Sequence, residues 1–342
     1  MRNIYGITRQ DLEKEMLALG QKTYRAKQLF TWLYQKNAQD FGEMSDVAKA
    51  FRVTLKTLYY LHKPTIFTKQ QASDGTIKLL LEMEDGAKVE TVLMRYEYGN
   101  SLCVSCQVGC SMSCTFCASG LLKKQRNLTA AEMLGQVMVM NDLLREEQTS
   151  VSHIVVMGTG EPFDNYTEVL NFIRICNDPH ALNIGARHIT VSTCGIPDKI
   201  RQYANEGLQV NLAISLHASN NYLRSQIMPI NRVYPLEELM EAIRYYEKTS
   251  SRRVTFEYIM LKDFNDRVEQ AKELAKLLKG LNAYVNLIPY NEVEGLSFFR
   301  SLRENVNLFM DTLKNSGVNV TVRKEFGHDI DAACGQLRAK RS

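Results

Sequence analysis

The sequence lacks any long hydrophobic run. No stretch of its 342 residues approaches the roughly 18 uninterrupted apolar residues that indicate a membrane-spanning helix. Its beginning, MRNIYGITRQDLEKEM, has no apolar segment of the kind that a secretory signal needs. We therefore expect a cytoplasmic protein with no membrane contact. Its thiols should stay reduced, so clustered cysteines indicate a metal or catalysis before they indicate disulfides.

A strong excess of one charge is also absent. The formal net charge is +4 and the pI is about 8.5. This mild excess permits an RNA partner but does not establish one, because many enzymes with small substrates have the same balance. The hydrophobic share of 45% and the charged share of 23% are typical of globular proteins. The length favours one large α/β domain with an appendage.

The first hundred residues divide into two segments. Residues 1–60 are predicted to be helical, because four apolar residues recur at i, i+3, i+4 and i+7: Ala26, Leu29, Phe30 and Leu33. Residues 61–100 change to strand-like runs around Asp85-Gly86, with a further turn signal, SDG, at 73–75. These patterns are typical of β-hairpins. We therefore predict a small helical domain over 1–60 and a β-hairpin linker over 61–100.

From residue 101 onward, strand-like and helical segments alternate. The strand-like segments are 101–106, 153–158, 188–195, 209–218, 253–261, 283–290 and 319–325. Thr129 and Glu132 form a capping-box signature at the start of the first intervening helix. Six β-α units in succession predict a parallel sheet, and a complete barrel would need eight. Residues 101–342 should therefore form an incomplete six-unit (β/α) barrel with its chemistry at the carboxyl ends of the strands.

Five of the eight cysteines lie between Cys103 and Cys117. Three of them, Cys110, Cys114 and Cys117, have the spacing C-x3-C-x2-C. A structural zinc site normally takes four ligands, and so does a 4Fe-4S cluster. Three thiolates would leave one iron of a cluster open to a substrate. The spacing on a β-α barrel therefore favours an iron-sulfur cluster, and a zinc or purely structural role is the alternative.

This spacing, directly after the first barrel strand, resembles the signature of the radical S-adenosylmethionine (SAM) superfamily. The stretch GTGEP at 158–162 is similar to the part of that signature that binds the SAM amino group. The resemblance implies one 4Fe-4S cluster per chain, held by the three cysteines. It also implies that the amino and carboxylate groups of SAM chelate the open iron.

Further motifs narrow the resemblance. GEPFDNY, NIGARHITVSTCGI, VNLAISLHAS, MPINRVYP, VNLIPYN and GHDIDAACGQLRAK resemble the bacterial RNA adenine-C2 methyltransferases of the RlmN type over nearly the whole chain. The related Cfr-type adenine-C8 enzymes are the alternative. The resemblance implies two substrates, an adenine in the peptidyl-transferase region of 23S rRNA and the adenine 3′ to the anticodon of some tRNAs. It also implies an electron donor such as flavodoxin or ferredoxin, and we expect a monomer.

The resemblance assigns roles to individual residues. Cys334 would be methylated by one SAM and, after a second SAM is consumed, would carry the methylene to C2 of adenine. Cys103 would then attack the Cys334 sulfur and form a transient disulfide, with Glu90 as the proton acceptor. The implied SAM contacts are Gly160, Glu161, Ser192, Ser215, Leu216, His217 and Asn291. The helical domain over 1–60 would be the RNA-docking element through Lys22, Arg25, Lys27 and Lys36, with a plain packing role as the alternative.

Overall fold

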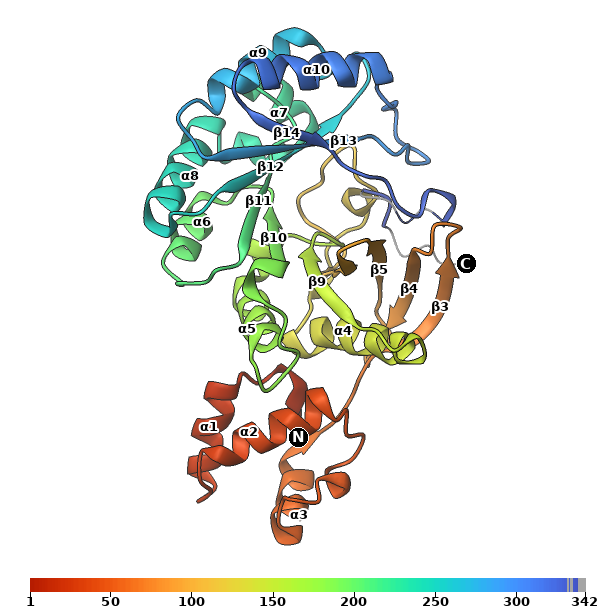
Figure 1. Cartoon of the computed structure of the whole chain (residues 1–342), viewed down its shortest axis with the longest axis vertical. Helices are drawn as coiled ribbons and strands as arrows, with labels where there is room; N and C mark the ends of the chain where they lie inside the picture. The colour runs from red at the N-terminus through yellow and green to blue at the C-terminus, as the bar shows by residue number, and fades with distance from the viewer. Residues whose placement is uncertain (331, 333–334, 338–342) are drawn as a thin grey trace.

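The computed structural model describes residues 1–330, 332 and 335–337, and a ten-stranded mixed sheet forms its body (Figure 1). The strand order is β14-β13-β12-β11-β10-β9-β6-β5-β4-β3. From β6 to β14, every neighbouring pair is parallel. The parallel strands are β6 (Gly99–Cys103), β9 (Val151–Val156), β10 (Ile189–Thr193), β11 (Asn211–Ser215), β12 (Val254–Met260), β13 (Ala283–Pro289) and β14 (Asn319–Val322).

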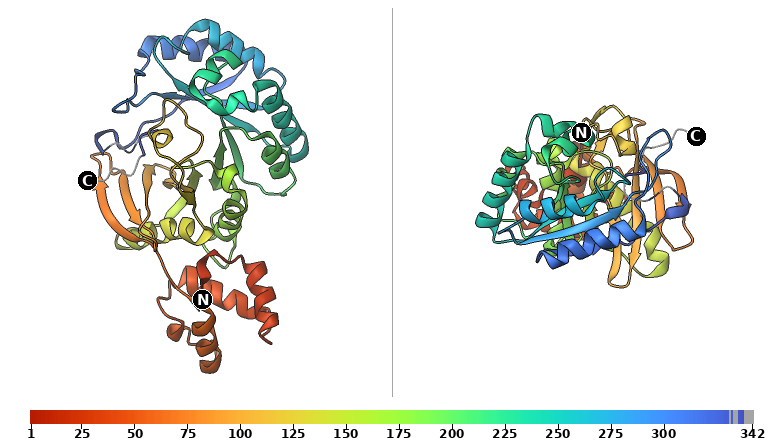
Figure 2. Two further views of the ribbon diagram at one scale, coloured as in Figure 1. Left: turned by 180° about the vertical axis from the view of Figure 1, so that it is seen from behind. Right: turned by 90° about the horizontal axis from the view of Figure 1, so that it is seen from above.

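Helices connect these strands and cover one face of the sheet (Figures 1 and 2). The connecting helices are α4 (Ala130–Leu144), α5 (Tyr166–Asn177), α6 (Pro197–Ala204), α8 (Leu236–Ser250), α9 (Val268–Leu277) and α10 (Arg303–Asn315), with the shorter α7 (Asn221–Ile227) after β11. Side chains alternate along each strand. On β9, Ile154 and Val156 enter the main core, whereas Val155 packs with a separate cluster that includes Val92. The predicted incomplete six-unit barrel is therefore confirmed.

The capping-box prediction at the start of α4 is also confirmed. Thr129 Oγ1 accepts a hydrogen bond from the Glu132 backbone N–H at 3.2 Å, and Glu132 Oε2 accepts one from the Thr129 N–H at 2.8 Å. Two amide groups that the helix cannot pair internally are thus satisfied. This cap begins the helix that follows the cysteine loop.

The segment 61–100 forms three antiparallel strands that extend the barrel sheet beyond β6. They are β3 (Thr65–Gln71), β4 (Ile77–Glu82) and β5 (Lys88–Tyr96). Gly75 and Gly86 lie in the two turns, each with φ +81°, where a residue without Cβ is favoured. Because β5 pairs with β6, these hairpins belong to the barrel sheet rather than lying apart from it.

The N-terminal segment forms a separate layer of helices below the barrel (Figure 1). Its helices are α1 (Arg9–Ala18), α2 (Tyr24–Phe30) and α3 (Lys49–Leu58). The four predicted core residues Ala26, Leu29, Phe30 and Leu33 are all fully buried. Arg9 Nε donates to Asp178 Oδ2 at 2.6 Å and ties this layer to the barrel. Among the described helices, none is both long and apolar enough to cross a membrane.

Candidate active site

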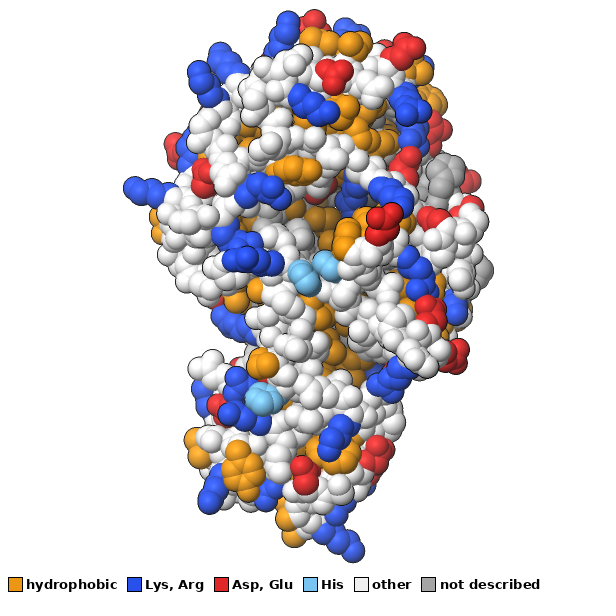
Figure 3. Space-filling view, viewed as in Figure 1, with side chains coloured by type: hydrophobic (Ala, Val, Ile, Leu, Met, Phe, Trp, Pro, Cys, Tyr) orange, Lys and Arg blue, Asp and Glu red, His pale blue; other side chains and the backbone are white. Residues whose placement is uncertain are grey.

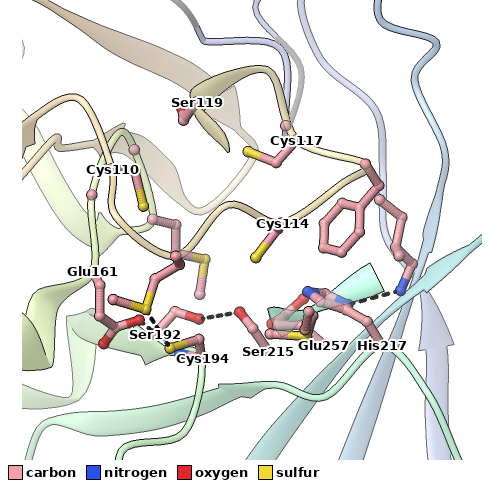
Figure 4. Close-up of a pocket in the computed structure, with 18 of the residues that line it drawn as sticks. Cys110, Cys114, Cys117, Ser119, Glu161, Ser192, Cys194, Ser215, His217 and Glu257 are labelled. Carbon is pink, nitrogen blue, oxygen red and sulfur yellow. Dashed lines mark hydrogen bonds between the residues drawn. The ribbon is translucent and has the colours of Figure 1, made fainter. Parts of the chain in front are cut away.

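One pocket lies at the carboxyl ends of the parallel strands, beneath the cysteine loop (Figure 4). Its wall includes eight of the predicted site residues: Cys110, Cys114, Cys117, Gly160, Glu161, Ser192, Ser215 and His217. These residues come from the loops or ends of four elements, so the parallel topology gathers side chains that lie far apart in the sequence.

A short two-stranded ladder closes the base of the cysteine loop. Its strands are β7 (Gln107–Val108) and β8 (Arg126–Asn127). Gly109 begins the loop with φ +75°, and a Cβ atom there would lie 2.2 Å from the Lys123 carbonyl oxygen. Only glycine fits this position. The turn directs the chain back over the pocket, and all three cysteines then face it (Figure 4).

The described part of the chain contains the three thiols but no ready site for a single metal ion. Ligands of one tetrahedral zinc at about 2.3 Å would hold their sulfurs about 4 Å apart. Within the described residues, no three Cys, His, Asp or Glu side chains lie close enough to share one metal ion. Cys110, Cys114 and Cys117 all line the pocket, and their spacing in the sequence makes them the candidate cluster ligands. Burial raises the pKa of Cys110 to about 11 and also raises the pKa of Cys114 well above its ordinary value. Iron would hold both as thiolates, because a bound cation reverses the effect of burial.

The glycine-rich turn after β9 brings backbone close to the pocket. Gly160 has φ +113°, and a Cβ atom there would lie 2.6 Å from Gln107 Cβ and 2.9 Å from Cys106 Sγ. Across the pocket, Ser192 Oγ and Ser215 Oγ lie 3.2 Å apart. These two hydroxyls and the exposed backbone provide the donors and acceptors that a polar cofactor such as SAM needs.

Glu161 is positioned by the protein itself. Its carboxylate accepts hydrogen bonds from Thr193 Oγ1 at 2.7 Å, the Cys194 N–H at 2.8 Å and the Phe163 N–H at 2.9 Å. Burial raises the pKa of Glu161, and these three hydrogen bonds oppose that shift. The carboxylate thus joins the loops after β9 and β10, so we expect neighbouring carbonyl groups to provide much of the contact to an ammonium group.

His217 is held as a neutral ring. Its Nδ1 accepts from the Ile259 N–H at 3.1 Å, so its proton lies on Nε2. Burial, with a smaller effect of the Arg224 charge, lowers the pKa of His217 to about 3. Its ring also packs edge-on against Phe116 with centroids 4.9 Å apart. His217 therefore offers the pocket an N–H donor and no charge.

Two predicted SAM contacts do not line this pocket. Leu216 is fully buried below it, because it follows Ser215 on the strand and points to the opposite face. Asn291 lies beyond the end of β13 and lines a neighbouring cavity with Phe326 and Ala332. Arg323 lies on the wall of both cavities, so Asn291 is near the site but separate from its main pocket.

Three charged residues on or behind the pocket wall were not predicted from the sequence. Glu257 and Arg323 lie on the wall. Arg224, on α7, is fully buried behind the wall and donates to the Cys194 carbonyl at 2.6 Å. The sequence could have identified Glu257 as a candidate site residue, because it is the one charged residue in the buried strand VTFEYIM. Arg224 contacts the Cys194 carbonyl, 30 residues away along the chain, and Arg323 contacts Glu257 on another strand, so no local spacing marks either residue.

Cys103 and Glu90 lie beside the pocket on the same face of the sheet as Ser192, because Cys103 pairs with Val155 and Val155 pairs with Thr190. The register pairs Val92 with both Cys103 and Lys78. Glu90, two residues before Val92, therefore points to the same side as Cys103. Glu90 Oε1 lies 3.4 Å from Lys78 Nζ, and both side chains are nearly buried. Ala332 packs in the cluster that borders Cys103.

The predicted methyl carrier, Cys334, lies outside the described residues. The described residues that follow it contact the end of the cysteine loop. The Gly335 carbonyl accepts from the Ala118 N–H at 2.8 Å, and the Leu337 carbonyl accepts from Ser119 Oγ at 2.7 Å.

A partial parallel barrel with three cysteines over the mouth, directly after its first strand, defines the radical SAM class. Residues 104–278 match the Radical SAM superfamily, and the chain belongs to that superfamily. Residues 2–61 match the "Ribosomal RNA large subunit methyltransferase N-terminal domain".

Full-length relatives identify the particular family. The chain is 55% identical over 340 residues to the "Probable dual-specificity RNA methyltransferase RlmN" of Spiroplasma citri, covering 99% of this chain and 98% of that protein. A protein of the same name from Streptococcus equi subsp. equi is 55% identical, with 98% and 95% covered. A radical SAM methyltransferase from Sphaerobacter thermophilus has a similar crystal structure, with TM-score 0.93 and 44% identity over 99% of this chain and 100% of that chain. This chain belongs to the RlmN family.

Family membership confirms the predicted class of enzyme, a SAM-dependent radical methyltransferase. It also implies the predicted cofactors, a 4Fe-4S cluster and SAM. Cys110, Cys114 and Cys117 would hold the cluster, and the turn at 158–162 with Ser192 and Ser215 would hold SAM. The pocket suits both, since it combines a thiol-lined roof with a polar wall.

Proposed function

We propose that this chain methylates C2 of an adenine in 23S rRNA, in the peptidyl-transferase region, and of the adenine 3′ to the anticodon of some tRNAs. C2 lies between two electron-withdrawing ring nitrogens and is a poor nucleophile, so direct transfer of the SAM methyl group is disfavoured. When bound, the cluster and SAM supply the methyl group and the one-electron chemistry that avoids this mismatch. The remaining steps fall to residues of the chain.

One observation carries the proposal: the C-terminal segment packs on the face that holds Cys103 and Glu90. Phe326, Ala332 and Leu337 form a buried cluster with Val92 and Met94, and Cys103 borders it. The Asp74 side chain extends this contact, since its Oδ2 accepts a hydrogen bond from the Gly327 N–H at 3.0 Å. These contacts of described residues support the pairing of Cys103 with a thiol from the C-terminal part of the chain.

We assign three roles on this basis. Cys334 carries the one-carbon unit and becomes joined to C2 through a thioether. Glu90 accepts the proton that leaves C2. The Cys103 thiolate then attacks the Cys334 sulfur, so an S–S bond forms as the sulfur–carbon bond breaks, and the released carbon takes a proton to become the methyl group. The resulting disulfide is a two-electron oxidation of the two thiols, and a thiol reductant must restore them before the next turnover.

The product decides between the C2 and C8 alternatives. Anaerobically reconstituted protein, SAM and a reductant would be incubated with unmodified 23S rRNA fragments or tRNA, and the RNA digested to nucleosides. Mass spectrometry with both methyladenosine standards should show 2-methyladenosine. Recovery of 8-methyladenosine, or of no methyladenosine from a protein with a full iron content, would contradict the proposal.

Alanine variants of Cys334 and Cys103 should lose activity at different steps. Cys334→Ala has no carrier and should give neither product nor adduct. Cys103→Ala should still join RNA to Cys334 but cannot release it, and should accumulate a slowly migrating band that RNase shortens. Cys176→Ala, which alters a fully buried cysteine of the main core, is the control and should turn over normally. Normal turnover by Cys103→Ala would contradict the role assigned to Cys103. Accumulation of a covalent RNA adduct by Cys334→Ala would contradict the role assigned to Cys334.

RNA is the proposed macromolecular partner, and Lys and Arg side chains flank the hollow in the barrel face (Figure 3). The exposed cations of the N-terminal layer, Lys22, Lys27 and Lys36, would contact phosphates, together with Arg25. Binding should therefore weaken with salt, and each removed phosphate contact should reduce the slope of log K against log salt by about 1. We further propose a cytoplasmic monomer that takes electrons from a flavodoxin or ferredoxin.

A further inference from the structure

A row of polar side chains crosses the barrel sheet from the pocket outward. The register pairs Ser215 with Glu257, Glu257 with Asn286, and Asn286 with Thr321. Because residues paired across neighbouring strands point to the same face, these four side chains share the barrel side of the sheet. Ser215 and Glu257 lie on the pocket wall, whereas Asn286 and Thr321 do not. Glu257 is thus the polar group that follows the two pocket serines along the sheet (Figure 4).

One oxygen of Glu257 has no hydrogen-bond partner within the described residues. The side chain is 4% exposed, and Oε1 accepts from Asn286 Nδ2 at 3.0 Å. Oε2 is buried and accepts no hydrogen bond from the described part of the chain. Arg323 Nη1 lies 3.8 Å from it, which is within the range of an ion pair but too long for a hydrogen bond. A buried carboxylate oxygen is costly to leave unpaired. This geometry therefore indicates that Oε2 is available to accept a hydrogen bond from a bound ligand.

We propose that Glu257 is an adenosine-binding residue, whose Oε2 accepts a hydrogen bond from a hydroxyl or amino group of a nucleoside lying beside Ser215. This inference rests on the proposed function, which brings two adenosines to the pocket: that of SAM and the target nucleotide of the RNA. Burial raises the pKa of Glu257, and the charge of the nearby Arg323 opposes that shift and so favours the ionised carboxylate. An acceptor at this place favours the amino group of adenine over the carbonyl group that guanine carries at the same position.

Three variants separate ligand binding from a structural role. Glu257→Leu keeps the volume and removes the acceptor, and Glu257→Gln keeps one carbonyl oxygen. Thr321→Val removes a hydroxyl from the same row outside the pocket and is the matched control. A hydrogen bond to a charged acceptor contributes about 10- to 150-fold in affinity. The affinity should therefore fall by that factor in Glu257→Leu, by a smaller factor in Glu257→Gln and by less than twofold in Thr321→Val. Iron content and melting temperature check the fold, and if Leu fails that check the Gln variant is compared with Thr321→Val.

Two measurements identify the source of the adenosine. Equilibrium dialysis of cluster-loaded protein with SAM alone should show the loss for Glu257→Leu if the cofactor is the ligand. If the target nucleotide is the ligand, SAM binding is unchanged, and KM rises for an RNA stem-loop that contains the target adenosine. An RNA with purine riboside at that position, which lacks the amino group, should then bind wild type and variant equally if that group is the donor.

The proposal is overturned if the Glu257 variants match Thr321→Val within twofold for both SAM and RNA. Its failure can be told apart from failure of the proposed function. In that second case the wild-type protein forms no 2-methyladenosine, while the dialysis with SAM still reports on Glu257.

Discussion

Replacing Arg224 would test whether a buried cation outside the recognised motifs holds the pocket together. Its guanidinium is fully buried and makes three hydrogen bonds of 3.2 Å or less, to the Cys194 carbonyl at 2.6 Å, Asn231 Oδ1 at 2.9 Å and the Leu216 carbonyl at 3.2 Å. A longer contact, at 3.4 Å, reaches the Ser215 carbonyl. Two of these carbonyls belong to the loops that carry the pocket. Arg224→Met keeps much of the apolar volume, removes every donor and leaves the three acceptors buried.

The expected loss of stability follows from this count. An unpaired buried acceptor costs about 2 kcal/mol, so three cost about 6 kcal/mol. Methionine offsets part of this, because it removes a poorly solvated cation. Burial lowers the pKa of Arg224 to about 10, and this shift corresponds to about 3 kcal/mol of desolvation. The net destabilisation is about 3 kcal/mol, which agrees with the cost of breaking a buried charged network.

The measurement is urea unfolding followed by far-UV circular dichroism, with the midpoint and slope compared between variants. Arg232→Met is the control, because Arg232 is exposed and surface substitutions change stability by about 0.5 kcal/mol or less. Arg224→Lys should not rescue the protein, since one ammonium cannot span three acceptors as the guanidinium does. A loss below about 1 kcal/mol for Arg224→Met, or full rescue by lysine, would refute the reasoning.

Three further predictions concern the cluster, the helix cap and the buried histidine. Cys114→Ala should lose the iron content and the broad visible absorbance of reconstituted protein, whereas Cys176→Ala should keep both; a full cluster in Cys114→Ala would remove that ligand assignment. Thr129→Ala should lower the unfolding free energy by about 1 kcal/mol in urea because the cap of α4 is lost, and no change would mean that the cap is unimportant. The pKa of His217 is lowered to about 3, while unfolded histidine titrates near 6.5; between these values the unfolded state binds more protons, so stability should fall as pH drops. His217→Asn, which can still accept from the Ile259 N–H and tolerates the left-handed φ of +60°, should show a shallower fall of the unfolding midpoint between pH 7 and 5, and an unchanged slope would contradict this.

The sequence alone determined the elements and the chemical class. Alternation of strand-like and helical periods predicted each barrel unit. In a strand with one face on the core, the core-facing side chains recur at every second residue, whereas in a helix they recur about every 3.6 residues. The C-x3-C-x2-C spacing at Cys110 predicted a shared metal centre, because three thiolates in one short loop can reach one cofactor. The cap at Thr129 was also local, since both of its partners lie within four residues. Each of these signals is contained in a short segment of chain.

Only the tertiary structure decided how separate segments complete the site. Glu161 has its carboxylate bound to the loop at Cys194, 33 residues away along the chain. Asn291, although it lies in a recognised motif, faces the cavity next to the main pocket. Glu257 and Arg323 meet because β12 and the segment after β14 are brought together in the sheet. Strand order and register set these contacts, and they depend on the packing of the entire chain, which no local spacing encodes.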